Sequence, residues 1–127
     1  MHKSKLVTAV IDCQVSDLTE ATRFWSAALG RAADASDEPA TEKYVRLGGP
    51  DEELILLLQK VPHLSRVHLD IETDNIEAEV ARLEALGAKR LEKIKTWWVM
   101  EAPTGHRFCV VRPQRDGRMP DNANVWP

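Results

Sequence analysis

The sequence predicts an α+β fold built from two βαβββ modules. Two stretches of the chain, residues 17–30 and 74–87, are similar to each other, and both end in Leu-Gly. Each follows a segment in which apolar and polar residues alternate, which is the pattern of a strand with one packed face. A long unit present twice indicates a duplicated module, because a solenoid needs about three or more repeats to bury its core.

The first module is expected over residues 6–60. Its helix begins with Asp17 and Glu20, a spacing that resembles a capping box, and it ends at Gly30. Pro and Gly at 37–41 and 48–51 indicate turns. The module therefore reads as a strand, a helix and three strands, over residues 6–15, 17–29, 31–35, 43–48 and 53–60.

The second module is expected over residues 66–112. Asp74 and Glu77 repeat the helix start, and the strand before it carries Val67 and Leu69 on one face and polar residues on the other. The predicted elements are a strand, a helix and three strands, over residues 66–72, 75–86, 88–94, 96–101 and 107–112. Matching the two first strands makes Val10 equivalent to His68 and Asp12 equivalent to Asp70, and predicts that Ala9, Ile11, Val67 and Leu69 pack under the helices.

Length and composition favour one compact domain over residues 1–113, followed by a loosely held polar tail at 114–127. A net charge of −3 gives no electrostatic reason to expect nucleic acid or an anionic membrane as a partner. No apolar run approaches the roughly 20 residues that cross a bilayer, and no signal peptide precedes the first strand. Two cysteines are too few for a disulfide scaffold. We expect a cytoplasmic protein.

Six short motifs in order resemble one known group. They are Val15–Leu18 with Phe24-Trp25 and Leu29-Gly30, Leu58–Pro62, Arg66–Ile71, Ala81–Ala88, Trp98–Met100 and Pro103–Val111. Together they cover residues 6–113 and resemble the vicinal oxygen chelate superfamily of glyoxalase I, bleomycin-resistance proteins and extradiol dioxygenases, and within it the small glyoxalase-like domain proteins. The resemblance implies the glyoxalase/bleomycin resistance/dioxygenase fold, in which two modules curl a mixed sheet around a ligand pocket.

The resemblance also implies four metal-ligand positions on the pocket wall. Three fall here on Val10, His68 and Cys109, and the fourth falls within residues 54–59, where only Gln59 could coordinate a metal. Valine has no donor atom, and an amide, one imidazole and one thiol make a poor set for Ni, Fe or Mn. We therefore expect no metal and no other cofactor. An atypical divalent metal is the alternative.

Side chains on the predicted pocket face are the candidate site. His68 is a candidate general acid or base, with Asp70 as a possible catalytic carboxylate, or else a hydrogen-bonding handle for a polar ligand. Asp12 and Asp70 are expected either to share a proton or a cation, or to form salt bridges with Arg46 or Arg66. Trp97 and Trp98 point to opposite faces of a strand, and the sequence leaves open which one faces the pocket. The full set of candidate pocket residues is Asp12, Tyr44, Gln59, His68, Asp70, Trp97, Trp98 and Cys109.

Two functions of different class follow from these residues. The first is a metal-independent protein that binds or sequesters a small molecule, with aromatic and charged residues lining the pocket. The second is a glyoxalase-like lyase or isomerase that uses His68 with a carboxylate or an atypical divalent metal. In either case we expect a homodimer, because sheet edges and the Trp97–Trp98 strand need cover.

Overall fold

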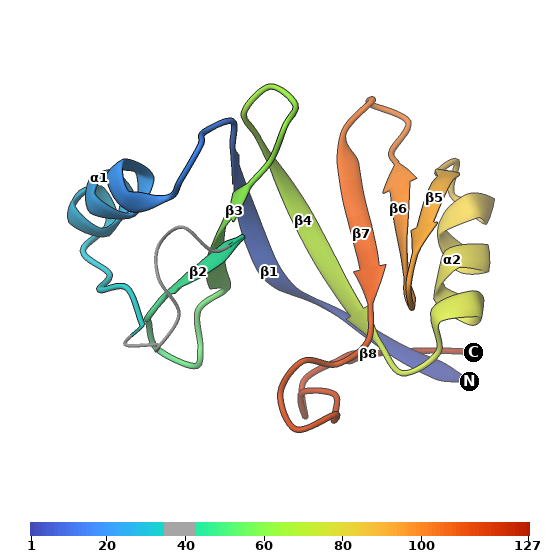
Figure 1. Ribbon diagram of the computed structural model, residues 1–127. Coiled ribbons are helices and arrows are strands. Elements are labelled where there is room, and N and C mark those ends of the chain that lie inside the picture. The colour runs from blue at the N-terminus through green and yellow to red at the C-terminus, as the bar shows by residue number, and fades with distance from the viewer. Residues whose placement is uncertain (35–42) are drawn as a thin grey trace. The chain divides into compact units, whose positions relative to one another are not determined.

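The computed structural model describes residues 1–34 and 43–127, which form two compact units (Figure 1). We call Thr8–His68 the N-terminal module, and Met1–Val7 together with Leu69–Pro127 the C-terminal module. The first seven residues thus belong with the second half of the chain. The predicted first module begins at residue 6, so Leu6 and Val7 had been assigned to it instead.

The N-terminal module pairs three strands beside one helix. It contains β1 (His2–Cys13) from Thr8 onward, α1 (Thr19–Leu29), β2 (Tyr44–Leu47), β3 (Ile55–Lys60) and the start of β4 (Arg66–Thr73). β1 runs parallel to β3, and β3 is antiparallel to β2. The strand predicted at 31–35 is reduced to an isolated bridge between Ala33 and Leu47, and residue 35 lies outside the described part of the chain.

The C-terminal module repeats this order. The rest of β4 is followed by α2 (Ile76–Ala85), β5 (Lys89–Ile94), β6 (Trp97–Glu101), β7 (Arg107–Val111) and β8 (Asn124–Trp126). β4 runs parallel to β7, and β6 is antiparallel to both β7 and β5. In each module the first strand is therefore the parallel neighbour of the last strand of the βαβββ unit. The duplicated α+β architecture predicted from the sequence is confirmed.

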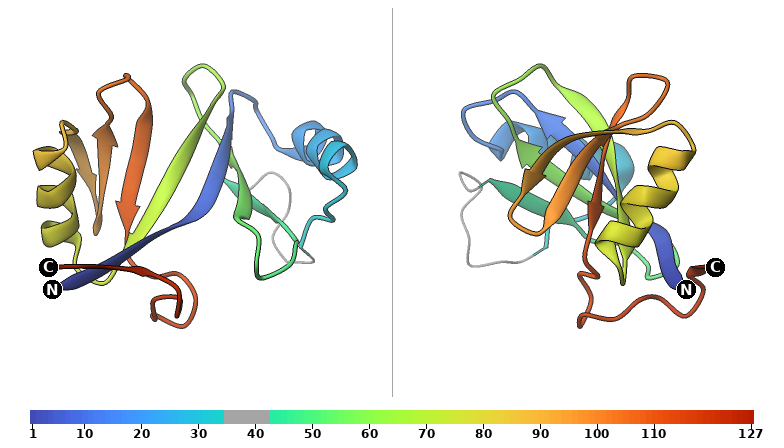
Figure 2. Two further views of the ribbon diagram at one scale, coloured as in Figure 1. Left: turned by 180° about the vertical axis from the view of Figure 1, so that it is seen from behind. Right: turned by 90° about the vertical axis from the view of Figure 1, so that its right-hand side faces the viewer.

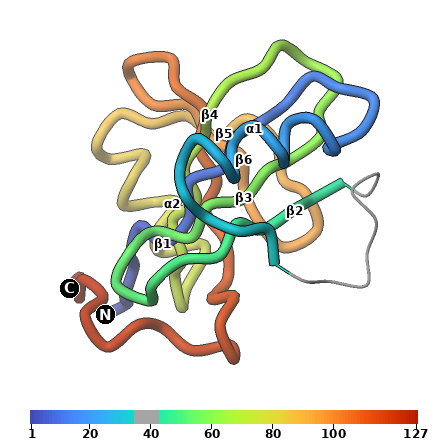
Figure 3. Tube along the Cα trace, turned by 90° about the vertical axis from the view of Figure 1, so that its left-hand side faces the viewer, coloured from blue at the N-terminus to red at the C-terminus, as the bar shows by residue number. Residues whose placement is uncertain are grey.

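Each helix covers one face of the strands in its own module. In the N-terminal module, α1 lies beside the strands (Figure 3). Leu18, just before α1, packs with Cys13, Leu47 and Leu58, and Trp25 packs against this cluster. In the C-terminal module, α2 lies across β5, β6 and β7 (Figure 2), where a second cluster is formed by the apolar side chains Val80, Met100 and Val110.

The prediction that Val67 and Leu69 pack under the helices is wrong. Val67 is 58% exposed and Leu69 is 42% exposed. The helices contact other strands, so that neither core cluster contains a β4 residue among the residues described. Alternation had correctly identified an apolar face of β4, but alternation alone does not say which strands a helix covers.

The two helix starts use different capping residues. Asp17 Oδ1 accepts the backbone N–H of Thr19 at 2.9 Å, and this bond lowers the pKa of Asp17. Asp74, predicted to act in the same way, instead accepts the backbone N–H of Lys3 at 2.8 Å. Asn75 is the N-cap of α2, and its side chain accepts the N–H of Ala78 at 3.0 Å. The N-cap positions of the two copies are equivalent, Leu18 and Asn75, but only Asn75 supplies a side-chain cap.

The C-terminal tail is more ordered than predicted. β8 pairs antiparallel with the beginning of β1, where Trp126 is the partner of His2. The indole N–H of Trp126 donates to Ser4 Oγ at 2.8 Å, and the guanidinium of Arg82 lies 3.9 Å from the centre of its ring. A lone Trp near the end of a polar segment was the sequence signal for this attachment.

Candidate functional site

A row of polar side chains crosses the strands of the N-terminal module. Asp12 is the register partner of Gln59, and Gln59 is the partner of Tyr44, so these three residues lie side by side on β1, β3 and β2. Their chain neighbours Cys13, Leu58 and Val45 belong to the core cluster that packs with α1. Because successive side chains of a strand point to opposite faces, the polar row of Asp12, Gln59 and Tyr44 projects away from the helix.

Hydrogen bonds connect Gln59 to Tyr44 within this row, and Asp12 to His68 on β4. The amide of Gln59 donates to Tyr44 Oη at 3.2 Å. His68 Nδ1 lies 2.7 Å from Asp12 Oδ2, and Arg66 Nε lies 4.0 Å from the same oxygen. Asp12 is only 2% exposed and the His68 side chain 13% exposed. Of the two arginines predicted as partners of Asp12, Arg66 is confirmed, whereas Arg46 pairs with Asp34 at 3.5 Å.

The bond between Asp12 and His68 fixes the chemistry of the imidazole. An ionised carboxylate can only accept hydrogen bonds, so when Asp12 is ionised the proton of this bond belongs to Nδ1 of His68. A carboxylate in this position holds the ring orientation and favours one tautomer, as it does for histidines that act as bases or ligands. The arrangement can therefore orient His68 for hydrogen bonding or proton transfer.

The C-terminal module presents a second set of candidates on one face. Asp70 is the register partner of Cys109, which also pairs with Val99. Trp97 is two residues before Val99 on β6 and so shares this face. Trp98 projects to the other side, where it packs against the core cluster beneath α2 and its indole N–H lies 3.4 Å from Glu77 Oε1. Trp98 is therefore the tryptophan that faces α2, and Trp97 lies on the opposite face of β6.

Glu72 is a buried acid that the sequence reading did not single out as a site residue. It is 1% exposed, and its Oε2 atom has no hydrogen-bond partner among the residues that the structure describes. Burial raises the pKa of Glu72, and the neighbouring charge of Asp70 acts in the same direction, while the Gln114 N–H and Arg115 oppose them. Its position on β4, two residues after Asp70, was the only signal in the sequence.

The metal-ligand set that the resemblance implies does not fit the residues present. Val10 is buried and offers no donor atom. The amide of Gln59 is bonded to Tyr44, and His68 Nδ1 is bonded to Asp12. Amide oxygen and a single imidazole are weak replacements for the imidazole and carboxylate ligands that Ni, Fe and Mn favour.

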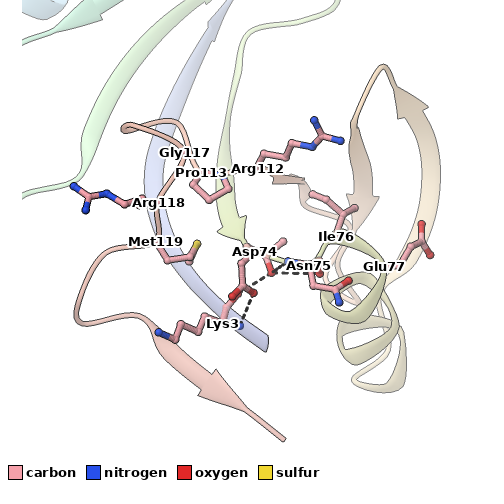
Figure 4. A pocket seen from close by; sticks show the side chains of 11 residues that line it. Lys3, Asp74, Asn75, Ile76, Glu77, Arg112, Pro113, Gly117, Arg118 and Met119 are labelled. Carbon is pink, nitrogen blue, oxygen red and sulfur yellow. Dashed lines mark hydrogen bonds between the residues drawn. The ribbon is translucent and has the colours of Figure 1, made fainter. Parts of the chain in front are cut away.

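A cavity lies elsewhere, on the C-terminal module. It has a volume of about 700 Å³ beside the start of α2 and contains none of the candidate site residues. Three cations line it, but Figure 4 shows the side-chain ends of Lys3, Arg112 and Arg118 pointing in different directions rather than toward a common centre. A smaller cavity of about 590 Å³ lies beside Trp126 and Arg82. Neither cavity is lined by the candidate residues, and the candidate site is therefore defined by the polar side chains themselves.

Comparison with known proteins agrees with this architecture. The sequence model of the glyoxalase-like domain matches residues 8–111. The chain belongs to this family. It is thereby a member of the glyoxalase/bleomycin resistance/dioxygenase group, the vicinal oxygen chelate superfamily, as its motifs suggested. No curated protein matches the sequence.

Solved structures show the same fold at low sequence identity. A hypothetical protein from Bacillus halodurans C-125 has a TM-score of 0.61 at 10% identity, covering 88% of this chain and 96% of that chain. A methylmalonyl-CoA epimerase variant from Streptomyces coelicolor, in complex with 2-nitronate-propionyl-CoA, has a TM-score of 0.53 at 13% identity, covering 91% of this chain and 98% of that chain. These similarities establish the fold of the glyoxalase-like domain and leave its ligand open.

Within the described residues, no helix is long and apolar enough to cross a membrane.

Proposed function

We propose that this glyoxalase-like protein binds a small molecule without a metal ion, to sequester or sense it. The observation that carries the proposal is the 2.7 Å bond between Asp12 and His68. Among the implied metal positions only His68 carries an imidazole, and Asp12 holds it through a hydrogen bond. The equivalent position on β1 is the buried Val10. The same residues that make a poor metal site make a suitable hydrogen-bonding surface for a polar ligand.

The exposed members of the candidate set supply the remaining contacts. Tyr44 is 41% exposed and bonded to Gln59, so both groups can exchange their mutual hydrogen bond for bonds to a ligand. Trp97 is half-buried on the face that carries Cys109 and Asp70. On the C-terminal module by itself, this ring can stack on a planar ligand, a contact worth about 0.5–1.5 kcal/mol beyond the area it buries.

A second candidate function is that of a lyase or isomerase. The burial of the Asp12–His68 pair favours it, because a histidine oriented by a carboxylate is a common general acid or base. In this case His68 would move a proton on the bound molecule, and Asp12 would hold the ring. Turnover of a bound ligand, lost in His68→Ala but with binding retained, would distinguish the enzyme from the binding protein.

A metal assay on the full chain, purified without chelator, tests the proposal most directly. We expect well under one equivalent of Ni, Fe, Mn or Zn, because the available donors are a poor set for these ions. Stoichiometric metal that disappears in the His68→Ala variant would contradict metal-free binding and favour the alternative with an atypical metal. His106→Ala, in the hairpin turn between β6 and β7, is the matched control.

A ligand screen by thermal shift tests the site. Compounds that stabilise the wild type should stabilise His68→Ala less, by about 1–3 kcal/mol in binding free energy if a buried polar partner is left unpaired. Trp97→Ala should lose about 0.5–1.5 kcal/mol in addition to buried area. Compounds that stabilise the wild type and both variants equally would place the ligand elsewhere on the protein.

A further inference from the structure

We infer that Asp12 makes the proposed ligand site selective for a neutral hydroxyl group that donates a hydrogen bond. The inference rests on the proposed function, since it names the chemical class that the polar row binds. It depends on one carboxylate whose two oxygen atoms have different surroundings.

The two oxygens of Asp12 differ in their partners. Oδ2 accepts the hydrogen bond from His68 at 2.7 Å and also faces Arg66 at 4.0 Å. Oδ1 is buried and accepts no hydrogen bond from any residue in the described ranges, 1–34 and 43–127. A buried acceptor without a donor is uncommon in folded proteins and is energetically unfavourable. A ligand that brings a donor to Oδ1 therefore removes this penalty on binding.

The charges around Asp12 select the kind of donor. Arg66 already supplies a positive charge beside the carboxylate, so a cationic ligand would meet this arginine as well as the aspartate. An anionic ligand would meet the unbonded oxygen and be repelled. A hydroxyl group donates one proton without adding charge, which is the change that Oδ1 requires.

Gln59 and Tyr44 provide the route to this oxygen. Gln59 is the register partner of Asp12 and therefore its direct neighbour on this face. A single hydrogen bond of 3.2 Å ties its amide to Tyr44, whose side chain is well exposed. In the inferred complex, the ligand hydroxyl bonds Oδ1 from this side, and the neighbouring amide and phenol bond the rest of the ligand.

The test compares two probes of similar shape, benzyl alcohol and benzyl methyl ether, titrated into the isotope-labelled full chain and followed by NMR. Only the alcohol has a hydroxyl proton to donate. The wild type should bind the alcohol about tenfold or more tightly than the ether, the effect of one hydrogen bond to a charged group.

Asp12→Asn replaces the acceptor Oδ1 with an NH₂ donor and keeps the hydrogen bond to His68. The amide oxygen continues to accept from His68, so the NH₂ group takes the place of Oδ1 and donates instead. The ratio of the two affinities should fall to about one. Asp34→Asn is the matched control, because it makes the same substitution at an exposed carboxylate of the same module, paired with Arg46, and should leave the ratio unchanged.

Several results would overturn the inference. Equal affinities of the wild type for both probes, with shifts at Gln59 and Tyr44, would exclude hydroxyl selectivity but leave the proposed ligand site intact. A wild-type ratio retained in Asp12→Asn would show that another residue selects the alcohol. Tighter binding of benzylammonium than of benzyl alcohol would indicate a cation site. Probes that shift neither Gln59 nor Tyr44 would count against the proposed site itself.

Discussion

Three buried carboxylates in this protein have different environments, and the differences follow from their hydrogen-bond partners. Glu79 is buried, and although burial acts to raise its pKa, bonds from Arg82, His2 and Ser4 outweigh this effect and lower the pKa. Glu72 has fewer partners, and burial raises its pKa. Asp12 has one oxygen bonded to His68 and the other without a partner among the described residues. The number of donors around each carboxylate decides whether it is a structural anchor or a reactive group.

Glu72→Gln should stabilise the protein at neutral pH. The folded-state pKa of Glu72 is raised, so ionisation above that pKa destabilises the fold, and this penalty disappears as the pH falls below the ordinary glutamate range. We expect the variant to gain about 1 kcal/mol at pH 7, in the range reported for buried unpaired polar groups, and to lose this advantage toward acidic pH. Denaturant unfolding at several pH values measures it.

Glu92→Gln, on exposed strand β5, is the control and should change little. A Glu72→Gln variant that is less stable than the wild type at pH 7 would mean that the attraction of Arg115 dominates over burial.

At the scale of elements, the two copies of the βαβββ unit keep the same order but differ at their helix starts. The copies share an acid three residues before a Glu, yet Asp17 accepts the first N–H of its own helix whereas Asp74 accepts the N–H of Lys3. In the second copy Asp74 accepts the backbone N–H of Lys3, and Asn75, the next residue, caps the helix. A tertiary contact has thus displaced a local preference.

Asn75→Ala should therefore destabilise the protein, while Asn75→Asp should not. Loss of the side-chain acceptor for the Ala78 N–H is expected to cost about 1 kcal/mol of unfolding free energy. Aspartate retains the acceptor and places a negative charge at the helix N-terminus, where it is favourable. Thermal unfolding of both variants distinguishes them. Equal loss of stability in both would show that the cap is not the cause.

The last strand is held mainly through one side chain. Trp126→Ala removes the hydrogen bond to Ser4 and the stacking of Arg82, which should cost roughly 1–3 kcal/mol and increase hydrogen exchange at the start of β1. Val125→Ala, at an exposed neighbouring position, is the control and should leave both measurements nearly unchanged. Similar exchange in the two variants would contradict an anchoring role for Trp126.

At the scale of the whole molecule, apolar side chains remain exposed on both modules. Val67 and Leu64 of the N-terminal module and Leu69 of the C-terminal module are uncovered in the single chain. Exposed apolar residues that gather on one surface commonly mark an interface between proteins. Trp98, in contrast, is partly covered by its packing beneath α2, so it no longer supports the expectation of a partner.

We predict a homodimer, measured as twice the chain mass by light scattering in the micromolar range. Val67→Asp should shift the protein toward the monomer, because a charge would have to be buried at the contact. Leu86→Asp, at another exposed apolar position, is the control and should leave the mass unchanged. A wild-type protein with the mass of one chain would contradict the prediction.

The sequence by itself determined the duplicated βαβββ order, the position of both helices and the family. These features depend on local periodicity, on glycine at the end of α1 and on short motifs, all of which are properties of neighbouring residues. It also placed Asp12, Gln59 and Tyr44 among the candidates, because alternation along each strand assigns side chains to faces.

Only the tertiary structure decided which of these candidates meet. The pairing of β1 with β3 and β2 sets Gln59 between Asp12 and Tyr44, and the hydrogen bond to His68 selects the partner of Asp12. Packing also decided that Trp98 lies beneath α2, that Val67 is exposed, and that Trp126 pairs with the start of β1. Register and packing join residues that are far apart in the chain, and no local pattern records which distant strand or helix will lie beside a given residue.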